Sequence, residues 1–152
     1  MPTADMSLIS SVRLPRDDKA PRQARRIVTG WLGGDDVLLP DALLVMVEMI
    51  TNAVQHVESG EGRDWVMLRL LHGRGVLHVE VTDPGSSRTS PEALNGEADP
   101  QPPPVASGRG RALHIVRVIS EGRCGTYVND EGHRVVWADL PCPDAPARRG
   151  SR

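Results

Sequence analysis

The sequence predicts an α/β sandwich, in which one mixed sheet of about four or five strands is covered on one face by three helices. Two patterns in the 152-residue chain support this fold class. In some segments apolar residues recur at helical spacing, which is typical of helices that pack on a core. In others they alternate with polar residues, which is typical of strands with one buried face. We expect a single domain over residues 1–140.

The predicted elements follow one another with short turns between most of them. They are a strand over 6–14, a helix from 17 or 18 to about 32, a helix from about 40 to 56–59, strands over 65–72 and 76–83, a helix from 108 to about 121, and strands over 123–128 and 134–140. The tail over 141–152 is rich in Pro, Arg and Gly, so we expect it to be disordered.

The first strand and the first helix are bounded by proline and aspartate. The strand alternates weakly and stops at Pro15, which favours an edge strand. Asp17 or Asp18 can cap the helix that follows. One face of this helix is apolar, and the other carries Lys19, Arg22, Arg25 and Arg26. We interpret the basic face as a solvated surface and leave open a role in docking a partner.

The second predicted helix carries two polar residues in an otherwise uncharged apolar run. Glu48 and Asn52 are four residues apart, so their side chains lie one turn apart on one face. Glu48 is the only charged residue from 42 to 57, which is unusual for a face that meets water. This pattern indicates a helix whose polar residues line a cavity.

The strand over 76–83 alternates cleanly and ends in a carboxylate. Its apolar side is formed by Leu77, Val79 and Val81, and the other side by His78, Glu80 and Thr82. Continuing the alternation places Asp83 on the apolar side, followed at once by Pro84 and Gly85. A buried carboxylate without a partner is costly, so Asp83 is expected to have one.

Residues 84–107 have no hydrophobic period and are rich in Pro, Ser and Gly. A loop of this length inside a domain is usually a functional lid or a disordered segment. It is followed by Gly108, Arg109 and Gly110, which open the third predicted helix. The N–H groups at a helix start favour bound anions such as phosphate.

The composition excludes several classes of protein. The formal net charge is −2, which does not indicate a nucleic-acid or membrane-surface binder. The longest apolar run is too short to cross a bilayer. The two cysteines are too few for a disulfide scaffold. We therefore expect a cytoplasmic protein that binds neither nucleic acid nor membrane directly.

Glu48 with Asn52, Asp83 with Gly85, and Gly108 with Gly110 occur in an order that resembles the ATP site of the GHKL superfamily, whose fold is called the Bergerat fold. The resemblance covers about residues 6–140. The run from Val47 to His56 is similar to the first motif of the bacterial anti-sigma-factor and serine-kinase branch. The strand from Val136 to Leu140 is similar to the last strand of that branch.

The resemblance implies a role for each of these residues. Asn52 would supply an oxygen ligand to Mg²⁺, and Glu48 would accept a proton from the nucleophile beside the γ-phosphate of ATP. Asp83 would accept a hydrogen bond from the adenine amino group, and Gly85 would let the backbone approach the base. The ATP phosphates would meet the N–H groups of Gly108 and Gly110, and Arg109 would add positive charge there.

Two positions depart from the family pattern. Ser87 stands where the family usually has a glycine. After Gly110 the family often has a bulky apolar residue and then glycine, whereas this chain has Arg111 and Ala112. Both changes bear on how closely the backbone follows a nucleotide, and hence on affinity and turnover rather than on the fold.

These roles lead to three alternative functions. The first is an ATP-dependent serine/threonine protein kinase of the anti-sigma-factor type, whose partners would be an antagonist protein and a sigma factor. The second is a catalytically inactive or weak nucleotide-binding module that acts by sequestering a partner. The third is a hydrolase, in which water replaces the protein hydroxyl. Homodimer formation is left open.

Overall fold

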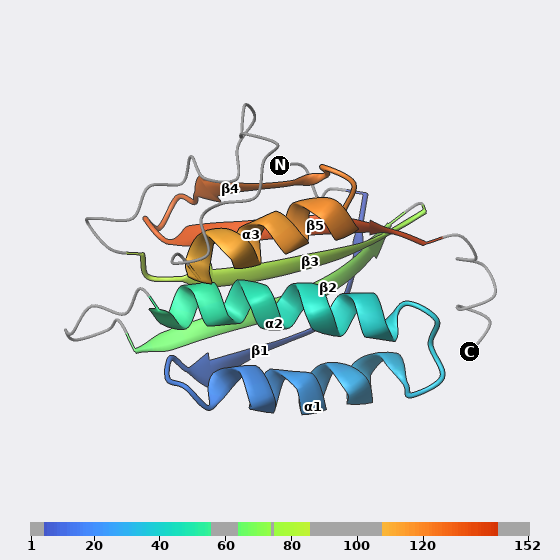
Figure 1. The fold of residues 1–152 in the computed structure, drawn as a ribbon, viewed down its shortest axis with the longest axis horizontal. Coiled ribbons are helices and arrows are strands. Elements are labelled where there is room, and N and C mark those ends of the chain that lie inside the picture. The colour runs from blue at the N-terminus through green and yellow to red at the C-terminus, as the bar shows by residue number, and fades with distance from the viewer. Residues whose placement is uncertain (1–4, 56–63, 74, 86–107, 143–152) are drawn as a thin grey trace.

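A computed structural model describes residues 5–55, 64–73, 75–85 and 108–142, with the backbone alone at 108–113. The elements are β1 (Ser7–Pro15), α1 (Ala20–Leu32), α2 (Leu39–Gln55), β2 (Trp65–Gly73), β3 (Val76–Asp83), α3 (Gly108–Ile119), β4 (Cys124–Val128) and β5 (Arg134–Pro141). Figure 1 shows the helices together on one face of the sheet, so the predicted two-layer α/β sandwich is confirmed.

The prediction of a mixed sheet was wrong. The strand order is β1-β2-β3-β5-β4, and every pairing is antiparallel. The connection from β3 through α3 to β4 does return the chain in the same direction. However, β5 lies between these two strands and separates them, so no parallel pair forms. β2 with β3 and β4 with β5 are consecutive strands that turn back on themselves, and β1 pairs with β2 after α1 and α2.

The core lies between α2 and the sheet. Met46, Met49 and Ile50 on α2 are fully buried, as are the apolar residues of β3 that face the helices. The chain contains no Phe. Two unbranched methionine side chains therefore fill part of the space that aromatic rings often occupy, since Met adapts to irregular gaps. Pro40 lies in the first turn of α2, where its missing N–H costs nothing.

The face of the sheet opposite the helices also buries polar groups. His78 and Glu80 point away from the helical layer, as the alternation predicts, but both are buried. Nδ1 of His78 lies 2.6 Å from Oδ1 of Asp139, and Nε2 lies 3.0 Å from Oε2 of Glu80. Arg69 donates to the second oxygen of Glu80 at 2.9 Å, and Trp137 stacks on the imidazole ring.

This arrangement keeps His78 in its charged form. Each ring nitrogen faces a carboxylate oxygen, and only the doubly protonated ring can donate to both. Burial by itself lowers the pKa of His78, but the hydrogen bonds and negative charges of Asp139 and Glu80 raise it to about 8. Burial likewise raises the pKa of Glu80, yet the contacts with His78 and Arg69 leave it below its ordinary value.

The stability of the fold is therefore expected to fall as the pH rises through about 8. The folded-state pKa of His78 lies above its unfolded value of 6.5, so the stabilisation is fully present below that value and is lost above the folded pKa. A shift of this size corresponds to about 2 kcal/mol. Urea unfolding between about pH 6 and pH 9.5 measures this change.

The matched control for this titration is His72→Gln, on the neighbouring strand β2. This variant should keep the loss of stability at alkaline pH, whereas His78→Gln should remove it. If His78→Gln loses stability between neutral and alkaline pH as steeply as the wild type, the imidazolium is not its cause.

Candidate functional site

Several segments that are distant in sequence meet at one end of the sandwich. Figure 1 shows the C-terminal ends of α2 and β3 beside the start of α3, at the left of the view. β1 ends at this same end, and β5 begins there, because Pro15 pairs with the first residue of β2 and Arg134 pairs with Asp83. The residues singled out in the sequence therefore belong to elements that converge.

The pair on α2 lies on one face of a continuous helix, as expected. Asn52 is 1% exposed, whereas Glu48, one turn earlier, is only partly buried. The neighbours Met49 and Ala53 pack in the core, which holds this part of α2 against the sheet. A buried amide and a partly exposed carboxylate are thus fixed on one helical surface.

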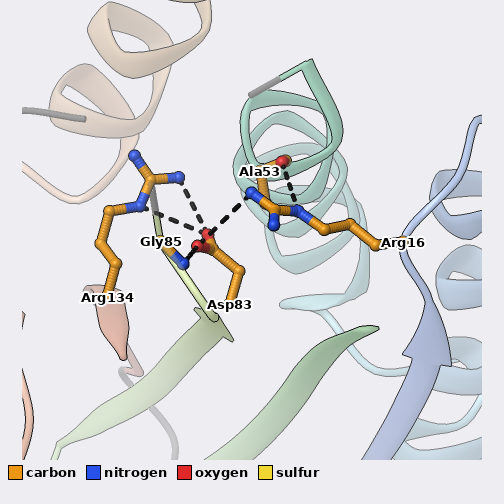
Figure 2. A network of polar contacts seen from close by, with 5 residues as sticks. All are labelled: Arg16, Ala53, Asp83, Gly85 and Arg134. Carbon is orange, nitrogen blue, oxygen red and sulfur yellow. Dashed lines mark hydrogen bonds and ion pairs between the residues drawn. The ribbon is translucent and has the colours of Figure 1, made fainter. Parts of the chain in front are cut away.

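Asp83 lies at the end of β3 with its side chain fully buried. Its Oδ1 accepts a hydrogen bond of 2.6 Å from the backbone N–H of Gly85. Its Oδ2 accepts two from the guanidinium of Arg134, at 3.0 Å and 3.3 Å (Figure 2). Figure 2 also shows Arg16 on the other side of the carboxylate, with Nη2 3.6 Å from Oδ1. The partner expected for Asp83 is therefore a pair of arginines.

Arg16 connects three elements at this end of the molecule. It follows directly after β1, and its backbone N–H donates to the carbonyl of Asp64 just before β2. Its Nε donates to the carbonyl of Ala53 near the end of α2 at 3.0 Å. Because the same guanidinium reaches Asp83, the residue next to Asn52 is tied to the end of β3.

Gly85 has a left-handed backbone conformation with φ +77°. A Cβ at this position would lie 3.8 Å from Cβ of Arg134, which is ordinary contact distance. Glycine is therefore required by the backbone conformation rather than by crowding within this chain. The turn that it makes aims its N–H at Asp83. The predicted approach of Gly85 to a base stays a prediction.

The third group lies at the start of α3. Gly108, Arg109 and Gly110 form its first turn, where backbone N–H groups have no partner in the preceding turn. Ser87 and the rest of 86–107 lie outside the described residues, as does the tail from 143, so the predicted lid and disordered tail stay predictions. The side chain of Arg111 also lies outside them.

Two residues of this site were not predicted from the sequence. Arg16 and Arg134 are the ionic partners of Asp83, yet neither belongs to a recognised motif. One signal was present: Arg134 opens a strand whose next inward positions are the apolar Val136 and Ala138, so the alternation places Arg134 on the same face as Asp83. The pairing of β3 with β5 was needed to connect them.

A comparison with protein-family models shows which family this chain belongs to. The family model of the histidine kinase-like ATPase domain matches residues 14–138, which include both arginines and all the elements of the site. This chain belongs to the histidine kinase-like ATPase domain family. Membership supports an ATP-binding regulatory function for the domain. The search of curated proteins gave no significant match.

The donor set fits the nucleotide and the metal ion that this ATPase family suggests. Asn52 offers an amide oxygen, which is the hard type of ligand that Mg²⁺ prefers, and the triphosphate would supply other ligands. The first turn of α3 offers N–H groups to phosphate oxygens. None of the helices in the described ranges is both long and apolar enough to span a bilayer.

Proposed function

We propose that this histidine kinase-like ATPase domain is a regulatory protein kinase that transfers the γ-phosphate of ATP to a hydroxyl group of a partner protein. The observation that supports it most directly is Glu48, one turn from Asn52 on the same face of α2. A domain that only binds nucleotide needs no base beside the metal ligand. By resemblance, the partners would be an antagonist protein and a sigma factor.

The proposed reaction is an in-line transfer. The partner's hydroxyl oxygen attacks the γ-phosphorus and forms the new O–P bond, while the bond between this phosphorus and the β,γ-bridging oxygen breaks. ADP leaves with the electron pair of that bond. The hydroxyl proton passes to the carboxylate of Glu48. Mg²⁺, held in part by Asn52, would neutralise charge on the phosphates.

A second candidate function is a nucleotide-binding switch without catalysis. It is favoured by the contacts of Asp83, whose two oxygens already accept hydrogen bonds within the chain. The charge of Asp83 is therefore balanced in the absence of nucleotide, and the fold at this end of β3 does not depend on nucleotide turnover. Ser87 and Arg111 point the same way, because they replace residues that let a backbone follow nucleotide closely. In this case the protein would act by holding a partner, and γ-phosphate transfer would be absent.

Nucleotide binding is the first property to measure, by titration calorimetry with ATP and Mg²⁺. We expect binding by the wild type and a loss of about 10- to 100-fold in Asp83→Asn, because a hydrogen bond to a charged group is lost. Asp130→Asn makes the same change at an exposed turn and should bind as the wild type does. If the wild type gives no heat and no rise in melting temperature, the proposal of a nucleotide site is wrong.

A further inference from the structure

Arg134 has hydrogen-bonding capacity beyond what its place in the fold uses. Its side chain is 8% exposed, and two of its N–H groups, on Nε and Nη2, donate to Oδ2 of Asp83. A guanidinium carries more N–H groups than these bonds use, and it stays charged at every accessible pH. Within the part of the chain that the structure describes, no contact engages Nη1. Figure 2 shows this nitrogen directed away from Asp83.

Arg16 also contacts Asp83, but its guanidinium makes a further contact with α2. Its Nε is bonded to the carbonyl of Ala53, so its guanidinium is held between α2 and β3. In the described part of the chain, the side-chain contacts of Arg134 are those with Asp83, and its backbone lies at the start of β5, beside the left-handed turn at Gly85. Of the two arginines, Arg134 is therefore the one with donors available to a ligand.

The arginines change what Asp83 offers to a nucleotide base. A carboxylate alone presents acceptors only, and it recognises any amino group. Here a carboxylate oxygen stands beside a permanent donor, because Nη2 of Arg134 lies 3.0 Å from Oδ2 and carries a second N–H group besides the one that donates to it. The matching edge on a ligand has a donor next to an acceptor. Adenine has this pattern, since its amino group adjoins the ring nitrogen N1.

We propose that Arg134 and Asp83 read the adenine edge together, with Asp83 accepting from the amino group and Arg134 donating to N1. This inference rests on the proposed nucleotide-binding function and adds a specificity residue to it. Recognition of N1 by a guanidinium makes the interaction charge-assisted, which strengthens it relative to a neutral hydrogen bond. It also gives Arg134 a contact with the ligand, which an arginine that only balances the charge of Asp83 would not make.

The test compares ATP with 1-deaza-ATP, in which C–H replaces N1, by titration calorimetry with Mg²⁺. We expect the wild type to bind 1-deaza-ATP at least about 10-fold more weakly than ATP. In Arg134→Met this ratio should fall to about one, because the donor to N1 is gone. 7-Deaza-ATP keeps N1 and should retain the wild-type affinity. Arg123→Met, at an exposed arginine, should keep the wild-type ratio.

Each other outcome overturns the inference in a recognisable way. If Arg134 only supports Asp83, Arg134→Met weakens ATP and 1-deaza-ATP equally and the ratio is unchanged. If the wild type binds both nucleotides alike, N1 is not read, and this result needs no variant to fold. If the wild type binds neither ATP nor its analogues, the nucleotide-binding function fails as well. Arg134→Lys keeps a charged donor and should keep part of the discrimination.

Discussion

Replacing Glu48 by glutamine is expected to lower γ-phosphate transfer by about 100- to 10,000-fold, the range of general base catalysis, while ATP binding stays close to the wild-type value. The carboxylate is partly exposed on α2, so glutamine can occupy its place without leaving a cavity. The measurement is transfer of radiolabelled γ-phosphate to a serine-bearing antagonist protein, beside calorimetric titration of the same variant with ATP and Mg²⁺.

Asp41→Asn is the matched control for Glu48→Gln. It makes the same change from carboxylate to amide on the same helix, but in the exposed first turn. Its transfer rate should equal that of the wild type. Transfer that survives in Glu48→Gln at the rate of Asp41→Asn would falsify the assignment of the base. A wild type that binds ATP but transfers no phosphate would instead favour the non-catalytic switch.

Replacing Asp83 by alanine is expected to destabilise the fold by about 3–5 kcal/mol, the cost of breaking a buried ion pair from one side. The carboxylate is fully buried between Arg16 and Arg134, which are themselves buried. Both guanidinium groups would then lose their common counter-charge. The measurement is urea unfolding at neutral pH, where the guanidinium groups are charged.

Arg134→Met in the background of Asp83→Ala distinguishes this cause from simple loss of packing. The double variant should regain part of the lost stability, since one buried charge without a carboxylate is removed and an apolar group replaces it. If Arg134→Met adds its own full cost to that of Asp83→Ala, the two residues do not stabilise the fold through their ion pair. Asp130→Asn in an exposed turn should unfold as the wild type does.

The helices and strands could be predicted because each carries its own local pattern. Helical spacing in α2 and alternation in β3 depend only on which face of an element is buried. The position of β5 between β3 and β4 has no such local signal, since it depends on which edge of the sheet the last hairpin joins. For this reason the sequence indicated that Asp83 needs a partner, while Arg134 could be recognised as that partner only from the strand pairing.

The polar face of the sheet shows a second limit of prediction from the sequence. Alternation correctly placed His78 and Glu80 away from the helices, where side chains usually meet water. It carried no information on burial there, because burial arises from Trp137 and Arg69 on neighbouring strands. The raised pKa of His78 depends on Asp139 on the neighbouring strand and on Glu80 two residues along β3. Residue type and spacing within one strand were therefore sufficient to predict the direction in which each side chain points. They were not sufficient to predict whether that side chain is buried or charged.

The insertion of β5 between β3 and β4 also constrains the order in which the molecule is completed. Residues 134–141 are among the last of the described chain to leave the ribosome, yet they supply the partners of strand β3 on both sheet faces. Until they arrive, one edge of β3 is open, Asp83 lacks Arg134 and His78 lacks Asp139. The end of the domain that contains Asp83 is therefore assembled only when synthesis of the folded region is nearly finished.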